Sequence, residues 1–268
     1  SRSHALSTHP GGFEEVLRRY TELDDLTSTR QWPQFLNHAR DGVYRGELYL
    51  AGESGSRFLE VGCRSGGALI AASRNYREVW GIDIAHRWLV VARRRMEEAG
   101  VDANLACCSA DALPFRSGYF DCVYQEDTLQ HTDRQVESLQ ESDRVLCSDG
   151  RLLLTIWNRF CPLPEPHVNL WGVGYLPSKF RQSYVRIRAN LAYHIHLLSA
   201  SQLRNLIARL PSIKYSLEAG PLASRRLDRA GWPVSQLSRL YERLRKKRWL
   251  GKLLQMVAPT LVLRGRKV

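Results

Sequence analysis

Apolar positions follow two alternating spacings through the middle of the chain. Continuous apolar runs of strand length occur at 57–63, 78–84, 103–110, 120–126 and 151–158. Between these runs, apolar residues recur at helical spacing at 67–75, 86–100 and 134–147. Strands that alternate with helices of crossover length predict a parallel sheet that is buried on both faces. A turn is expected at 148–150, directly before the fifth strand.

Both flanks add elements to this core. Helical spacing precedes it at 12–21 and 32–51, and 52–56 has the composition of a loop. Behind the core, 159–198 combines prolines, aromatic residues and basic residues in no clean period.

Regular patterns return towards the carboxyl terminus. A helix is predicted at 199–210, with Ser199 or Ser201 as its N-cap. Strands are predicted at 213–220 and 260–268, and the segment between them has the composition of two helices.

We therefore expect four parts, as follows: an N-terminal helical cap at 1–50, a core at 51–158, a substrate-side insertion at 159–198, and a completion of the core sheet at 199–268 with a helical insertion at 221–257. The cap and the two insertions are expected to cover the working edge of the sheet. A chain of 268 residues is long enough to bury a sizeable core.

Composition excludes some classes of protein. Apolar residues make up 44% of the chain, yet no run reaches the roughly 18 apolar residues of a membrane span. The start of the chain is polar and lacks an apolar signal core, so a cytoplasmic location is expected. The six cysteines form no C-x-x-C pair, and no metal site is expected. The net charge of +12 permits an anionic partner without requiring one.

A glycine-rich turn follows the first predicted strand in "FLEVGCRSGGAL", residues 58–69. Gly62, Gly66 and Gly67 allow the backbone to turn tightly and to approach a ligand closely. The spacing matches neither G-x-G-x-x-G nor a phosphate-binding P-loop. A single turn of this kind also occurs as a plain connection between two elements.

Acidic residues end the first three strands. Glu60 lies in the first, Asp83 follows Gly62 by 21 positions, and Asp111 comes after the third. A carboxylate at Asp83 is placed to accept both hydroxyls of a ribose, and Asp111 to accept from an adenine amine. Either aspartate alone is equally well explained as a helix cap. Three carboxylates at successive strand ends favour a nucleoside site.

The motifs "LEVGCRSGG", "VWGIDI", "CSADALPF", "FDCVYQEDTLQHTD" and "ESDRVLCSDGRLLLTIW" together resemble class I S-adenosylmethionine-dependent methyltransferases. The resemblance spans about 58–158. It implies an α/β fold with three layers, Rossmann-like, in which a seven-stranded, mostly parallel sheet ends in an antiparallel last strand. It also implies S-adenosylmethionine as the cofactor.

The resemblance assigns roles to particular residues. The loop for the methionine end of the cofactor would contain Glu60, Gly62, Cys63, Arg64 and Gly66. Asp83 would bind the ribose, with Ile84 against the adenine, and Asp111 and Ala112 would bind the adenine edge. Gln125 and Glu126 would line the reaction face.

Arg64 departs from the family pattern, which has glycine at this position. One interpretation is a side chain that points to solvent or pairs with a neighbouring acid, on a permissive backbone. A second is a guanidinium that binds the carboxylate of the cofactor or of an acidic substrate. A third is a damaged cofactor site. If the loop needs a positive φ at Arg64, the cost is about 1–2 kcal/mol.

Candidate catalytic groups lie in two segments. "QEDTLQHTD" supplies Glu126, Asp127 and His131, of which the histidine is the candidate base. The insertion at 159–198 supplies His167 and Tyr193, in aromatic and proline-rich surroundings that suit a small-molecule pocket. Each histidine also has a plain interpretation as a packing residue.

The sequence predicts methyl transfer to oxygen or nitrogen of a small molecule, of the kind found in secondary metabolism. One alternative is attack on the methionine side chain, by aminocarboxypropyl transfer or by cyclisation that releases methylthioadenosine. The basic segment 239–252 suggests RNA as a rival substrate or a membrane surface as a contact, although a solvated helix face explains it equally well. A non-catalytic partner subunit is the last alternative. The oligomeric state is not predicted.

Overall fold

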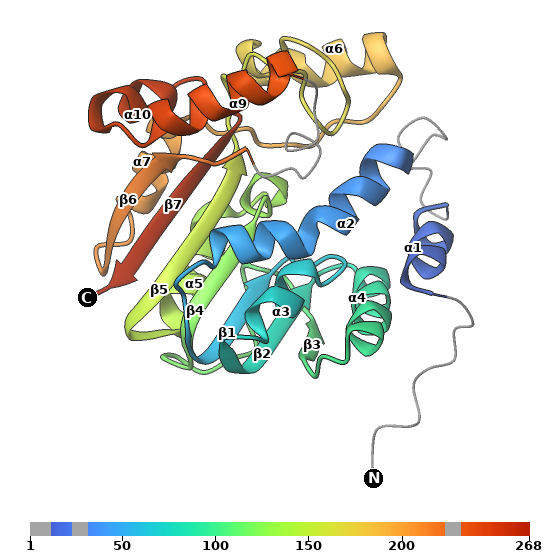
Figure 1. Ribbon diagram of the computed structural model, residues 1–268, viewed down its shortest axis with the longest axis vertical. Coiled ribbons are helices and arrows are strands. Elements are labelled where there is room, and N and C mark those ends of the chain that lie inside the picture. The colour runs from blue at the N-terminus through green and yellow to red at the C-terminus, as the bar shows by residue number, and fades with distance from the viewer. Residues whose placement is uncertain (1–11, 23–31, 223–231) are drawn as a thin grey trace.

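Seven strands form one sheet in the computed structural model, which describes residues 12–22, 32–222 and 232–268 (Figure 1). The strands are β1 (Gly55–Val61), β2 (Tyr76–Asp83), β3 (Asn104–Cys107), β4 (Phe120–Glu126), β5 (Leu146–Trp157), β6 (Ile213–Ala219) and β7 (Thr260–Lys267). Their order is β3-β2-β1-β4-β5-β7-β6, and β7 runs antiparallel to both of its neighbours. The predicted sheet, with its antiparallel last strand, is confirmed.

Helices cover both faces of this sheet. The helices of the described ranges are α1 (Phe13–Glu22), α2 (Trp32–Tyr49), α3 (Gly67–Ala72), α4 (His86–Ala99), α5 (Gln135–Val145), α6 (Ser178–Ala189), α7 (Ala200–Ile207), α9 (Trp232–Arg245) and α10 (Arg248–Leu254), with short 3-10 turns η1 (Leu129–His131) and η2 (Val173–Tyr175). Alternate residues of each strand point to opposite faces, so the sheet separates two apolar cores.

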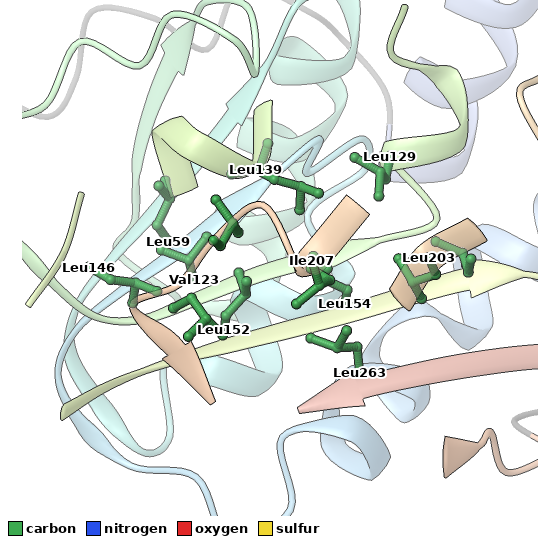
Figure 2. Close-up of a cluster of buried hydrophobic side chains, with 14 of the residues drawn as sticks. Leu59, Val123, Leu129, Leu139, Leu146, Leu152, Leu154, Leu203, Ile207 and Leu263 are labelled. Carbon is green, nitrogen blue, oxygen red and sulfur yellow. The ribbon is translucent and has the colours of Figure 1, made fainter. Parts of the chain in front are cut away.

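One core lies under α5 and α7, where Leu139, Leu203 and Ile207 pack on side chains from β1, β4 and β5 (Figure 2). The other lies under α2, α3 and α4 and includes Phe58 and Tyr124. Both faces of the central strands are therefore dry, as their continuous apolar runs predict.

The chain changes direction in the sheet between β1 and β4. β1 leads outward to β2 and β3, whereas β4, its neighbour on the other side, leads to β5. Ligands of open α/β sheets bind beyond the carboxyl ends of the strands at such a switch point. A ligand site is therefore expected at the loops after Val61 and Glu126.

Helix α2 crosses α3 at very close range. A Cβ placed on Gly46 would lie 2.8 Å from both Ala68 Cα and Ala71 Cβ, whereas one on Gly42 would meet its nearest neighbour, Gly67 Cα, at 3.4 Å. The small residues on both helices let the two backbones approach. As a result α2 lies beside the glycine-rich loop that begins α3.

Two local predictions differ from the structure. The turn expected at 148–150 lies inside β5, where a register shift from the pair Phe120/Leu146 to the pair Cys122/Arg151 makes a bulge, with Asp149 at φ 64°. Helix α6 occupies part of 159–198, where no period was recognised. Only Arg181 and Val185 of α6 are buried, so no continuous apolar stripe of this helix faces the core.

The four-part division of the chain stays a prediction, and its residues 1–11, 23–31 and 223–231 lie outside the described ranges. The N-cap choice is settled in favour of Ser199. Its side chain accepts from Gln202 N while the Gln202 side chain accepts from Ser199 N, which is a capping box.

Candidate functional site

A pocket opens at the switch point, where ligands of open α/β sheets bind. Its lining comes from α2, from the end of β1 and its loop, from the start of α3 and from the end of β4, as follows: His38, Ala39, Gly42, Arg45, Glu60, Gly62, Cys63, Arg64, Ser65, Gly67, Ala68 and Glu126. Five of the residues predicted for the methionine-end loop are thus in one region, since Gly66 lies between two of the lining residues.

The glycine-rich loop folds back over the end of β2. The N–H groups of Gly62 and Cys63 both donate to Ile82 O at 2.8 Å. Gly62 and Gly66 have φ values of 77° and 71°, and a side chain at Gly62 would collide with Thr128. These two positions need glycine because of their left-handed backbone, and Gly62 also because of the space.

Arg64 has a left-handed backbone as well, with φ 43°, and its side chain turns into the site. Its Nη1 donates to His38 Nε2 at 3.2 Å and its Nη2 donates to Asp127 O at 3.1 Å. The same Nη2 lies 3.5 Å from His131 Nε2. The guanidinium is therefore held by neighbours from α2 and from the segment after β4.

Glu60 lies inside the pocket and is 3% exposed. Its Oε2 atom is buried and has no hydrogen-bond partner among the described residues. Burial, followed by the negative charge of Glu126, raises the pKa of Glu60 well above its ordinary value. An unsatisfied buried carboxyl oxygen is costly unless a ligand donates to it.

Two residues of α2 complete this wall, and sequence analysis missed both. Arg45 forms an ion pair with Glu126, and its Nη2 donates to His38 Nε2 at 3.0 Å. Because His38 Nε2 accepts from two guanidiniums, the imidazole is neutral. Desolvation, followed by Arg45 and Arg64, lowers the pKa of His38 well below its ordinary value. The only available signal was their spacing of seven residues, which places both on one helix face.

The acids after β4 are less suited to catalysis than predicted. Glu126 is 7% exposed and is paired with Arg45, so it is not a free base. Asp127 has φ 50°, and its Oδ1 is buried with no hydrogen-bond partner in the described part of the chain. Burial, followed by Glu126, raises the pKa of Asp127.

The predicted nucleoside residues lie along the carboxyl edge of β2 and β3. Asp83 is buried, and its oxygens accept from Arg64 N at 3.0 Å and from Ala85 N at 2.9 Å. Ile84 is 74% exposed. Asp111 accepts from Ser109 and pairs with Arg134 at 3.0 Å, and Ala112 beside it is exposed.

Gln125 does not face the pocket. It is fully buried, and its Nε2 donates to Ser142 Oγ of α5 at 2.7 Å. Adjacent residues of a strand point to opposite faces, so Gln125 and Glu126 cannot both line the reaction face. The prediction that Gln125 lines the reaction face is therefore corrected: its side chain packs towards α5.

A chain of polar side chains connects the insertion to the glycine-rich loop. Glu165 is 3% exposed; it accepts from the N–H groups of His167 and Val168 and also contacts His167 Nδ1. His167 Nε2 lies 3.2 Å from His131 Nε2, with the two rings edge to face. Although His131 keeps solvent contact, desolvation and then Arg64 lower its pKa to about 3.

The Tyr193 hydroxyl makes no hydrogen bond to this chain or to any other described residue. It is buried in a separate apolar cluster with Val173, Val185 and Leu197, and burial raises its pKa. In the structure it packs the insertion and has no access to the pocket. Within the described ranges, no group of three or more histidine, cysteine or carboxylate side chains is arranged to hold a metal ion.

Known proteins share both sequence and fold with this chain. A family described as a methyltransferase domain matches residues 59–154. The ubiquinone/menaquinone biosynthesis C-methyltransferase UbiE of Nitrosospira multiformis is 31% identical over 199 residues, which cover 69% of this chain and 76% of that protein. The chain belongs to the class I S-adenosylmethionine-dependent methyltransferases. It is therefore an enzyme that uses S-adenosylmethionine, and the interpretation as a non-catalytic subunit is set aside.

Solved structures agree on the fold of this methyltransferase. The phosphoethanolamine N-methyltransferase 2 of Haemonchus contortus has a TM-score of 0.57 at 18% identity and covers 96% of this chain, which covers 60% of it. The [4+2]-cyclase SpnF has a TM-score of 0.56 at 16% identity, with 96% of each chain covered. At these identities the likeness shows the fold alone. The different activities in the names of these two proteins illustrate that this fold does not determine the reaction.

In the described ranges no helix is long and apolar enough to cross a membrane.

The pocket fits the ammonium group at the methionine end of the cofactor, because the unpaired Oε2 of Glu60 offers an acceptor there.

Proposed function

We propose that this methyltransferase transfers a methyl group to an oxygen or nitrogen of a small-molecule acceptor, with His167 as the general base. The supporting observation is the chain from Glu165 through His167 to His131, which ends at Arg64 beside the pocket. A protic acceptor must lose a proton as its oxygen or nitrogen attacks, and a neutral histidine is suited to accept it.

The loop and strand ends would hold the cofactor. Glu60 would accept from its ammonium group, and Arg64 would bind its carboxylate. Asp83 would accept from the ribose, since each carboxylate oxygen has two lone pairs and each already accepts only one N–H. Ile84 would contact the adenine, and Asp111 and Ala112 its edge. When bound, the cofactor supplies a sulfonium methyl group that is already activated for transfer.

Glu165 gives His167 the form that a base needs. A proton on Nδ1, directed at Glu165, leaves the lone pair on Nε2. An acceptor hydroxyl would take the place next to Nε2 that His131 occupies in the structure. The proton would pass to Nε2, and the buried carboxylate of Glu165 would stabilise the imidazolium, as in other carboxylate–histidine pairs.

Carbon methylation of an aromatic ring is a second candidate. Two UbiE relatives support it: that of Nitrosospira multiformis, and that of Yersinia pestis at 30% identity over 202 residues. The same histidine would remove the proton of a ring hydroxyl and so make a neighbouring ring carbon nucleophilic. Both candidates have a small-molecule acceptor, and they differ in the atom that becomes methylated.

The test is product identification with methyl-labelled S-adenosylmethionine and a panel of hydroxylated, aminated and quinol acceptors. We expect S-adenosylhomocysteine only when an acceptor is present, and the chemical shift of the new methyl group separates O, N and C products. Methylthioadenosine formed without an acceptor would instead support attack on the methionine chain. Turnover of RNA with none of any small acceptor would favour the nucleic-acid alternative.

Two variants test the base. His167→Asn should lower kcat by about 10²–10⁴-fold while cofactor affinity is kept. Glu165→Gln should give a smaller loss, because the imidazole remains but its orientation and charge balance change. His194→Asn is the matched control, since His194 is exposed in the same segment. Full activity in His167→Asn would remove this residue from the mechanism.

A further inference from the structure

Helix α10 presents apolar side chains to solvent. Trp249 and Leu253 lie four residues apart on α10 and are 66% and 53% exposed, and Met256, in the turn that follows the helix, is 62% exposed. A stripe with this spacing normally faces the core of a protein. Here it faces outward, and an exposed apolar stripe indicates a binding surface.

Basic residues surround the stripe. Lys246, Lys247 and Lys252 are exposed beside it. From Arg243 to the last residue the sequence contains no aspartate or glutamate. The apolar stripe is therefore surrounded by charged residues that are all positive.

Helix α6 repeats this combination. Phe180 and Ile187 lie seven residues apart on one helix face and are 52% and 81% exposed. Lys179, Arg186 and Arg188 are exposed next to them. Between Glu165 and Glu218 the sequence again contains no acidic residue.

Both helices lie on one side of the molecule. Figure 1 shows α6, α9 and α10 beyond the end of the sheet at which β5 finishes. The pocket also lies at the carboxyl ends of the strands, where Nη2 of its lining residue Arg64 is 3.5 Å from His131 Nε2. We call the exposed residues of α6, of α10 and of the short segments on either side of α10 the basic apolar face; they are Lys179, Phe180, Arg186, Ile187, Arg188, Lys246, Lys247, Trp249, Lys252, Leu253 and Met256.

We propose that the basic apolar face docks on the surface of an anionic lipid bilayer. Tryptophan and leucine insert at the boundary between headgroups and acyl chains, while lysine and arginine pair with anionic headgroups. RNA would account for the basic residues and leave the apolar stripe in water. A second copy of the chain would cover the stripe and bring like charges together. A bilayer satisfies both features at once.

Docking in this orientation brings the carboxyl edge of the sheet towards the membrane. An acceptor with a lipid tail would then reach the site from the bilayer without entering bulk water. This consequence rests on the proposed function, whereas the docking itself does not.

Vesicle flotation without cofactor or acceptor tests the docking. The wild-type protein should bind vesicles that contain phosphatidylglycerol and bind pure phosphatidylcholine vesicles much more weakly. The variant Lys246→Glu/Lys247→Glu/Lys252→Glu should lose at least roughly 100-fold in partitioning, since each basic residue near the surface contributes about fivefold. Trp249→Ser/Leu253→Ser/Met256→Ser should also lose binding, at unchanged net charge.

A matched control places the same charge change at the opposite edge of the sheet. Arg77, Arg116 and Lys214 are exposed near the amino ends of β2, β4 and β6, and their reversal to glutamate should leave vesicle binding within about twofold. An equal loss of vesicle binding in this control would show that binding depends on net charge alone, and it would overturn the proposal. Dimerisation that the serine variant abolishes, or RNA binding without vesicle binding, would also overturn it.

Discussion

The main-chain N–H of Arg64 donates to Asp83 Oδ2 at 3.0 Å, across the gap between the loop after β1 and the end of β2. This bond attaches the proposed methionine-end loop to the proposed ribose carboxylate. The left-handed backbone of Arg64 directs its N–H at Asp83 and its side chain at His38 and Asp127. These contacts show that the guanidinium is held by protein neighbours, and its binding of a carboxylate stays a prediction.

Replacing Arg64 by glycine tests that role. Arg64→Gly should relieve about 1 kcal/mol of backbone strain, so the thermal midpoint should stay level or rise. Cofactor affinity or turnover should fall by about 1.5–3 kcal/mol, because a charged hydrogen-bonding group is removed. Calorimetric titration with S-adenosylhomocysteine measures the first, and an initial-rate assay the second. Arg64→Lys keeps the charge without the fork, and should recover part of the loss. Unchanged affinity and turnover in Arg64→Gly would show that the Arg64 side chain has no role in cofactor binding or in catalysis.

Glu60→Gln should stabilise the cofactor-free enzyme at neutral pH. The pKa of Glu60 is raised in the folded protein, so ionised Glu60 opposes folding once the pH exceeds its unfolded value of about 4.3. The glutamine variant should therefore gain stability relative to the wild type as the pH rises, on the order of 1.4 kcal/mol for each unit of the shift. Urea unfolding between about pH 4 and 8 measures this difference. A constant difference across that range would show that Glu60 does not titrate as argued.

The same carboxyl group should couple cofactor binding to protons. An ammonium group beside Glu60 favours the carboxylate, so binding should release a proton wherever Glu60 is protonated in the free enzyme. Affinity should accordingly rise with pH up to the raised pKa of Glu60 and then level off. Calorimetry in buffers of different ionisation enthalpy counts the released protons. Glu60→Gln should release fewer, and equal release by both proteins would contradict the proposed contact.

The crossing of α2 and α3 predicts opposite outcomes for two glycines on one helix. Gly46→Ala should destabilise the fold by about 1–3 kcal/mol, because the new methyl group meets Ala68 and Ala71 at 2.8 Å. Gly42→Ala has ordinary contact distances, and should be neutral or stabilising by up to about 1 kcal/mol through helix propensity. Denaturant melts compare the two. Gly46→Ala should also weaken cofactor binding, since α2 positions His38 and Arg45; equal stability of both variants would contradict the close crossing.

The alternation of strands and helices and the strand-end carboxylates follow from local sequence. Apolar runs and glycines act within a few residues, and parallel strands place successive carboxyl ends at one edge, so Glu60, Asp83 and Asp111 were predicted as a group. The position of Gln125 was also predictable from local sequence. Neighbouring residues of β4 point to opposite faces of the sheet, so Gln125 and Glu126 could not both face the pocket. The sequence did not predict that 148–150 belongs to β5, because serine–aspartate–glycine is typical of a turn and here forms a bulge at Asp149.

The polar contacts of the site were decided by tertiary structure. His131 and His167 meet across 36 positions of sequence, and Arg45 meets Glu126 across 81. Periodicity shows which face of a helix is apolar, but it does not show where along a neighbouring element that face will pack. The close approach of α2 to α3 and the path of the insertion set those partners, and both depend on how side chains from distant segments fill the same space.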